Sequence, residues 1–305
     1  MNEKELDDLI RDSIDMHFHV GPDILPRKFT VEELIREERG KIKGVALKAH
    51  SFPTIAAINQ AKNRPDDFTL IGSVTLNYFM GGFNSSAIYA SSVMSKDHPI
   101  IVWFPTVHAE NHLLKNHSEY EIPPEWVRDP NFKPRKKWDL RAIKVTDWAG
   151  KLIRKANYVL DMAQKMNCII ATGHISWQEA EKLALESLDR GLKVIVTHPM
   201  QKDIAMPLEV QKKLADKGAF IEYCYIMYLD RDFPSDYPVE EQVRCIKEIG
   251  SDRCIITSDG GQVRNPGPSE CLKAYVRLLG DKGLSLDEFK VMLQKNPEKL
   301  IKQSL

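Results

Sequence analysis

The sequence predicts a (β/α)8 TIM barrel of the α/β class, and three observations support this prediction. Eight short apolar runs alternate with amphipathic helical segments along the chain. The runs are rich in Ile and Val and lack clean polar alternation, which is typical of parallel strands covered by helices. Neighbouring runs end 25 to 35 residues apart with a single exception, as expected for repeated β/α units.

The residue ranges of the expected strands are 14–19, 44–50, 69–76, 99–104, 168–173, 193–198, 219–224 and 254–259. Helix-start signals lie between these runs. They are capping boxes at Thr30/Glu33, Ser176/Glu179 and Ser285/Glu288, Pro207 and Pro238 at first helical positions, and Asn296-Pro297 before a final helix. Strands and helices therefore alternate along the sequence.

The exceptional interval runs from Phe104 to Gly173, 69 residues, and predicts an insertion after the fourth strand at about residues 105–148. A short extra strand is expected at residues 142–145. Long aromatic-rich loops after barrel strands serve as lids or as interface elements, and both readings stay open. The aromatic residues are Tyr120, Trp126, Phe132 and Trp138. The whole chain, residues 1–305, is otherwise predicted to be a single domain.

Composition excludes several classes of protein. The 43 Lys and Arg residues balance 43 Asp and Glu residues, so the chain lacks the basic excess typical of nucleic-acid and membrane-surface binders. No apolar run approaches the 18 or more residues that span a bilayer, and the charged N-terminus has no signal-peptide core. Five cysteines without CxxC spacing suit a reducing compartment. We therefore expect a cytoplasmic protein whose partner is a small-molecule substrate; a homo-oligomer remains an open option.

Metal-type ligands stand at four of the predicted strand ends. They are His17 and His19, His174, His198 and Asp259. Alternation along a strand places His17 and His19 on the same side. Active sites of such barrels lie at the C-terminal rim, and four imidazoles with one carboxylate suit zinc or another first-row divalent ion. The sequence thus predicts a divalent metal site there.

This pattern resembles the amidohydrolase superfamily of metal-dependent hydrolases. The matching residues are His17-Phe18-His19 in the first strand, His174 in the fifth, His198 in the sixth and Asp259 in the eighth. The closing segment, residues 296–301, is similar to the NPA-L segment that often ends those barrels. The resemblance covers residues 14–301, and segments 19–23 and 77–84 look like a little-characterised bacterial and archaeal branch.

The resemblance implies roles for each position. His17, His19 and Asp259 would hold a first metal ion, and His174 and His198 a second; with one ion, His174 completes the site and His198 supports it without binding. Zinc is the expected metal, with one or two ions per chain. Asp259 and His198 are the expected catalytic residues, Asp259 being the general base on a metal-activated water.

The sequence departs from the family at the bridging ligand. Two-metal members usually supply a carboxylated Lys or a Glu from the fourth strand, and residues 99–104 offer neither. Lys48 lies in the apolar second strand, where burial would lower its pKa and leave an amine able to react with carbon dioxide. Lys48 is therefore included among the candidate ligands. The alternative is a Lys that pairs with a carboxylate at the rim. His50 shares the face of Lys48.

Other polar residues near the predicted rim are weaker candidates. They are Asn77, Gly81, Gly82, His108, Glu110, His112, Glu222, Tyr223, Tyr225 and Tyr228. Arg264, in the loop after the eighth strand, could pair with a substrate carboxylate or could be a surface charge.

Three functions remain in competition. The first is a metal-dependent hydrolase that attacks an amide, ester, lactone or cyclic imide carbonyl with metal-activated water. The second is a metal-dependent decarboxylase, because similar barrels remove carboxylate groups with one metal and no bridging Lys. The third is a non-catalytic barrel that binds a small ligand or a partner.

Overall fold

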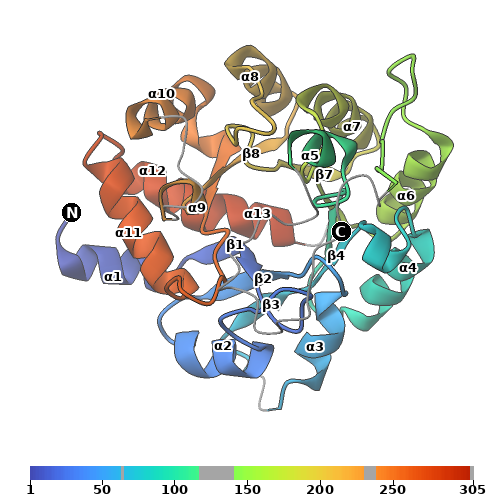
Figure 1. The fold of residues 1–305 in the computed structure, drawn as a ribbon. Coiled ribbons are helices and arrows are strands. Elements are labelled where there is room, and N and C mark those ends of the chain that lie inside the picture. The colour runs from blue at the N-terminus through green and yellow to red at the C-terminus, as the bar shows by residue number, and fades with distance from the viewer. Residues whose placement is uncertain (63–64, 117–140, 230–237, 303–305) are drawn as a thin grey trace.

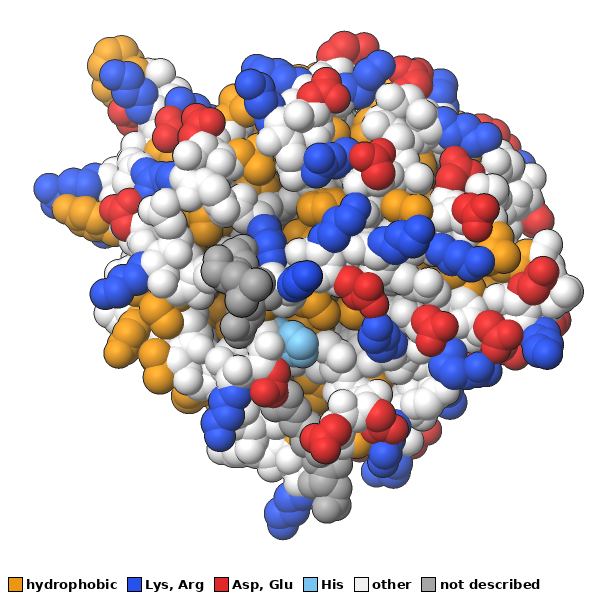
Figure 2. Space-filling view, turned by 180° about the vertical axis from the view of Figure 1, so that it is seen from behind, with side chains coloured by type: hydrophobic (Ala, Val, Ile, Leu, Met, Phe, Trp, Pro, Cys, Tyr) orange, Lys and Arg blue, Asp and Glu red, His pale blue; other side chains and the backbone are white. Residues whose placement is uncertain are grey.

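The computed structural model describes residues 1–62, 65–116, 141–229 and 238–302. Its strands occupy the centre of the molecule and its helices form a ring around them (Figure 1). Acidic and basic side chains lie interspersed over the face seen in Figure 2, in keeping with a net charge of zero. None of the helices in the described ranges is long and apolar enough to cross a membrane. The architecture confirms the predicted TIM-barrel class.

Every strand pair is parallel, in the order β1-β2-β3 and β4-β5-β6-β7-β8-β9. The strands are β1 Ile14–His19, β2 Gly44–Lys48, β3 Thr69–Ile71, β4 Ser73–Thr75, β5 Ile101–Trp103, β6 Ile169–Ala171, β7 Lys193–Val196, β8 Phe220–Cys224 and β9 Cys254–Thr257. The strand predicted at residues 69–76 is interrupted at Gly72. A Cβ at Gly72 would lie 3.0 Å from Ile55 Cβ, so helix α3 packs closely against the chain at the break.

The segment after β9 lies beside β1. The backbone N–H of Asp259 donates to His17 O at 2.9 Å, and that of His19 donates to Gly260 O at 2.9 Å. These bonds join the last strand to the first. They also bring a carboxylate from the end of the chain to two imidazoles near its start.

The helices contain the capping boxes expected at Thr30, Ser176 and Ser285. Pro207 and Pro238 occupy the N-cap position instead of the first helical position, because their ψ angles of 143° and 153° are extended. The two helices therefore begin one residue later than predicted. The α-helices are α1 Glu3–Arg11, α2 Val31–Glu38, α3 Thr54–Gln60, α4 Ser85–Met94, α5 Glu110–Lys115, α6 Arg154–Lys165, α7 Trp177–Asp189, α8 Leu208–Asp216, α9 Ile226–Leu229, α10 Val239–Ile249, α11 Pro268–Gly280, α12 Leu286–Lys290 and α13 Asn296–Ile301. Short 3-10 turns at Tyr78–Met80 and Ser251–Arg253 and a π-helical turn at Val291–Lys295 complete the description.

The barrel interior has an apolar layer that carries the site above it. Residues from most strands fill this layer: Ile14, Met16, Ala46, Ile71, Ile101, Trp103, Ile169, Ala171, Ile195, Phe220 and Ile255. The pairing register between β1 and β2 shifts between Asp15 and Phe18, where β1 leaves this layer. Such an irregularity re-aims side chains locally. His17 and His19 consequently face the interior beyond Met16, while Phe18 packs in the outer core.

Much of the predicted insertion lies outside the described residues, including Tyr120, Trp126, Phe132 and Trp138. The extra strand predicted at residues 142–145 is wrong. The chain forms only isolated bridges there, Ala109 with Ile143 and Thr146 with Leu152. The Glu179 carboxylate accepts hydrogen bonds from the backbone of Val145 and Thr146, so it takes donors that a strand ladder would use.

Candidate active site

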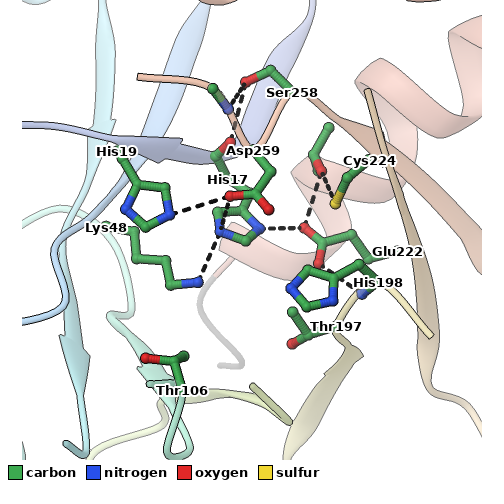
Figure 3. Close-up of polar contacts among 12 residues, drawn as sticks. His17, His19, Lys48, Thr106, Thr197, His198, Glu222, Cys224, Ser258 and Asp259 are labelled. Carbon is green, nitrogen blue, oxygen red and sulfur yellow. Dashed lines mark hydrogen bonds and ion pairs between the residues drawn. The ribbon is translucent and has the colours of Figure 1, made fainter. Parts of the chain in front are cut away.

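The six predicted site residues lie at or just beyond the carboxyl ends of β1, β2, β6, β7 and β9. Five of them, His17, His19, Lys48, His198 and Asp259, are labelled in Figure 3, together with Glu222 from β8. Direct polar contacts connect His17, His19, Lys48 and Asp259. His174 and His198 join the group through ring contacts instead.

Asp259 lies between the two histidines of β1. Its Oδ1 is 3.0 Å from His17 Nε2 and 3.2 Å from His19 Nε2, and its side chain is 15% exposed. Burial raises the pKa of Asp259, but His17, His19 and Lys48 outweigh burial and hold that pKa well below its usual value. Asp259 is therefore an ionised carboxylate that borders open space, suited to binding a cation or accepting a proton.

The backbone around Asp259 is constrained. Asp259 has φ 48° and His198 has φ 25°, in the left-handed region that non-glycine residues rarely adopt. A Cβ at Gly261 would lie 2.1 Å from His19 O, so glycine is required where this loop crosses β1. Strained residues of this kind persist where the surrounding structure fixes them, and they cluster at functional sites.

His17 is the most connected residue of the group. Its Nδ1 lies 3.0 Å from Glu222 Oε1, and its Nε2 lies 2.9 Å from Lys48 Nζ. Burial lowers the pKa of His17, but Asp259 and Glu222 outweigh burial and raise the pKa above its usual value. The contact with Glu222 fixes the ring, so Nε2 faces Asp259.

Glu222 lies behind His17, fully buried, rather than at the open rim where a substrate would reach it. It accepts hydrogen bonds from His198 N at 3.2 Å and from Thr257 Oγ1 at 3.0 Å. Burial raises the pKa of Glu222, but His17 and His198 outweigh burial and lower it. An ionised carboxylate that orients a ligand histidine is typical of metal sites.

Lys48 is buried at the end of β2, as the apolar run predicted. Its Nζ lies 4.3 Å from the centre of the Trp103 ring and 2.9 Å from His17 Nε2. Burial lowers the pKa of Lys48. Its hydrogen bond goes to an imidazole, whereas the carboxylates of Asp259 and Glu222 act on it electrostatically.

His174 and His198 lie beside each other with ring centres 5.0 Å apart, and the His198 ring centre is 6.1 Å from that of His17. The Nδ1 atom of each ring is buried and has no hydrogen-bond partner within the described residues. Burial lowers the pKa of His198 to about 4 and the pKa of His174 well below its usual value. Both rings are therefore neutral at pH 7, the form that binds metal ions.

The weaker candidates divide into interior and surface residues. His50, Asn77 and Thr106 form a buried network: Thr106 Oγ1 lies 2.9 Å from His50 Nδ1 and accepts from Asn77 Nδ2 at 2.7 Å. Tyr223 points away from the mouth and donates to Gln211 Oε1. Arg264 is exposed.

Sequence reasoning missed two residues at the site. The sulfur of Cys224, at the end of β8, lies within 4.8 Å of ligand atoms of both His17 and Asp259. Asp15 accepts from the backbone N–H of Ser258 at 3.1 Å, and burial raises the pKa of Asp15 to about 7. The strand-end position of Cys224 was the signal that could have identified it.

The donor set fits a divalent metal ion. Imidazole nitrogens and a carboxylate are the ligands of zinc and other first-row metals. Neutral His174 and His198 and ionised Asp259 are in the protonation states that binding requires. The buried Nδ1 atoms of His19, His174 and His198 have no hydrogen-bond partner among the described residues, so these nitrogens are available to bind a metal ion.

The sequence matches one family model. Residues 12–222 match the model of a family described as a family of unknown function, DUF6282. No curated protein matches the sequence.

The fold is similar to solved structures of hydrolases. A probable dipeptidase, PvdM from Pseudomonas aeruginosa, superposes with a TM-score of 0.63 at 14% identity, over 97% of this chain and 96% of that one. An amidohydrolase from the same organism gives 0.61 at 11% identity, over 97% of each chain. A probable 2-pyrone-4,6-dicarboxylic acid hydrolase from Acinetobacter baumannii gives 0.54 at 14%, over 95% and 98%. The likeness confirms the amidohydrolase-type barrel as the fold.

Proposed function

The chain belongs to the family DUF6282, and we propose that it is a metal-dependent hydrolase that attacks the carbonyl group of an amide, ester, lactone or cyclic imide. One observation carries the proposal. An ionised carboxylate, Asp259, lies between His17 and His19 at the mouth of the barrel, and the neutral rings of His174 and His198 lie beside this group. The printed names of the similar structures, a dipeptidase and two further hydrolases, support the same reaction class.

His17, His19 and Asp259 would hold a first ion, and His174 and His198 would hold a second ion or complete the first site. Zinc suits this set of donors. When bound, such an ion polarises a carbonyl group and lowers the pKa of water.

Asp259 accepts the proton that the attacking water loses. Its low pKa means that it is ionised at neutral pH, and its partial exposure leaves it accessible to a substrate. Because the carboxylic acid form is disfavoured, the proton passes readily to the departing nitrogen or oxygen of the substrate. His198, whose ring is stacked on that of His17, orients the substrate carbonyl or contributes to metal binding.

Two further residues have supporting roles in the proposal. Glu222 holds His17 in one orientation through the 3.0 Å contact with Nδ1. Lys48 is a candidate bridging ligand: its pKa is lowered by burial, so a larger share of the amine is neutral and able to form a carbamate with carbon dioxide. Formation of the N–C bond releases one proton from the amine.

The test combines metal analysis with a substrate screen. The protein is stripped with EDTA, reloaded with zinc, cobalt or manganese, and assayed against a panel of N-acyl amino acids, dipeptides, lactones and cyclic imides. Hydrolysis that returns in proportion to bound metal supports the proposal. Failure to retain metal, or release of carbon dioxide from carboxylated substrates without hydrolysis, contradicts it.

A further inference from the structure

A buried arginine lies in the loop that follows β1 and takes no part in the contacts described above. The Arg27 side chain is 4% exposed, and its partner Asp23 has a side chain that is 0% exposed. Arg27 Nε and Nη2 both donate to Asp23 Oδ2, at 3.0 Å and 2.7 Å. Burying a cation costs free energy, and the ion pair with Asp23 offsets part of that cost.

The loop that carries Arg27 is attached to the mouth of the barrel. Arg27 forms an antiparallel bridge with Gln262, three residues after Asp259. The backbone N–H of Lys28 donates to Gly261 O at 2.8 Å. Asp23 accepts from the backbone N–H of His50 at 3.2 Å. The pair is therefore fixed between the loops that follow β1, β2 and β9.

Asp23 anchors Arg27 rather than depending on it. Its carboxylate also accepts from Ile24 N at 2.9 Å and from Ser51 Oγ at 2.6 Å, in addition to His50 N. These donors satisfy the carboxylate without the arginine. The arginine, in contrast, has no other partner for its guanidinium among the described residues.

One edge of the guanidinium is left unused. Asp23 Oδ2 takes Nε–H and one hydrogen of Nη2, whereas Nη1 has no acceptor in the described part of the chain. The Arg27 side chain is not completely enclosed, since 4% of its surface remains exposed. The remaining Nη1 and Nη2 hydrogens form a pair of parallel donors, which matches the two oxygens of a planar carboxylate.

The charge of Arg27 acts on the site residues beside it. Burial is the largest cause of the lowered pKa values of His19 and His50, and the positive charge of Arg27 lowers both further. Arg27 is thus close enough to influence the side of the mouth where His19 meets Asp259.

We propose that the free edge of Arg27 binds a carboxylate group of the substrate, so that the enzyme acts on carboxylate-bearing amides, esters or lactones. The proposal rests on the proposed hydrolase function and names its substrate class. Arg264, which the sequence offered for this role, is exposed, whereas the Arg27 side chain is 4% exposed and held by Asp23.

The test measures binding without turnover. Metal-free, EDTA-treated protein is titrated with N-acetylglycine, with the neutral isostere N-acetylglycinamide and with inorganic phosphate. The variants are Arg27→Gln, Arg27→Lys and the control Arg264→Gln. We expect Arg27→Gln to weaken N-acetylglycine binding by about tenfold to a hundredfold, as for loss of a charge-assisted hydrogen bond pair. Arg27→Lys should recover part of the loss, and the control and the amide should show no change.

Three results would overturn the carboxylate site. They are unchanged N-acetylglycine affinity in folded Arg27→Gln, equal binding of acid and amide by the wild type, and Arg27-dependent binding of phosphate tighter than that of N-acetylglycine. If Arg27→Gln does not fold, the side-chain NMR signals of Arg27 in the wild type decide: no shift on adding N-acetylglycine refutes the proposal. Because no metal is present, these outcomes are independent of whether the reloaded protein hydrolyses anything.

Discussion

The mouth of the barrel has two halves that differ in how their polar groups are satisfied. The carboxylate half consists of His17, His19, Lys48, Glu222 and Asp259 and is joined by direct polar contacts. The imidazole half consists of His174 and His198, whose rings lie 5.0 Å apart and make no direct polar contact with Asp259. Their Nδ1 atoms have no partner among the described residues, as is also true of His19 Nδ1 in the carboxylate half.

The comparison shows that two buried histidines of one site can have pKa values shifted in opposite directions. In the carboxylate half, Asp259 and Glu222 raise the pKa of His17 against the effect of burial. In the imidazole half burial dominates, and the pKa of His198 falls to about 4. The carboxylate half contains the charged groups and the direct polar contacts, whereas the imidazole half consists of two neutral rings.

The largest effect is expected for Asp259→Asn. The amide preserves shape but cannot accept a proton, so kcat for the best substrate of the panel should fall about a thousandfold, the range of general-base catalysis. The assay compares proteins of equal metal content, with Asp252→Asn, an exposed residue of the turn before β9, as the control. Wild-type turnover in metal-loaded Asp259→Asn would remove Asp259 from the reaction.

Replacing one histidine of each half by alanine should lower the free energy of unfolding by different amounts. In metal-free protein, His17→Ala leaves Glu222 and Lys48 buried without their shared partner, which should cost about 3–5 kcal/mol. His174→Ala strands no buried charge and should cost about 1–2 kcal/mol. Urea unfolding at pH 7.5 measures both. Equal losses would mean that the polar contacts of the carboxylate half contribute nothing of their own.

Acidification should lower the folding stability of the protein through His198 in the imidazole half. The folded protein keeps His198 neutral down to a pKa of about 4, whereas the unfolded chain protonates it below its usual value of 6.5. The unfolded state therefore binds more protons in this window, and stability present above pH 6.5 is lost as pH falls toward 4. This difference corresponds to about 3 kcal/mol.

The measurement compares urea unfolding of metal-free wild type and His198→Asn from pH 7.5 to 4.5. The variant should lose less stability over this range than the wild type. Parallel pH profiles would show that the ring is not held neutral by the fold.

The sequence predicted the strands and the clustering of His17, His19 and Asp259 because both follow from local patterns. Apolar runs define the strands, and residues at their ends must lie on one rim. This reasoning brought His17, near the start of the chain, to Asp259, near its end. It also identified the three capping boxes.

What the sequence could not show depends on side-chain orientation and on long-range contacts. Glu222 is two residues from the end of β8, and only the packing places it behind His17. Arg27 and Asp23 sit in a loop without periodicity, so their burial and mutual contact follow from tertiary structure alone. The hydrogen bonds of Val145 N and Thr146 N to Glu179, far away in the sequence, likewise follow from tertiary structure.

The smallest effect is expected from Glu222→Gln, which tests whether the carboxylate half works through the orientation of His17. Glutamine keeps the size of the side chain but removes the charge that raises the pKa of His17. Loss of such an orienting carboxylate typically weakens metal binding by about tenfold to a hundredfold. Zinc affinity is measured by competition with a chelator, with the exposed Glu240→Gln as control. A lowered His17 pKa also means less competition from protons, so the loss of zinc on acidification should begin at a lower pH than in the wild type. Unchanged affinity together with an unchanged pH profile would show that Glu222 fills space behind His17 and does not tune it.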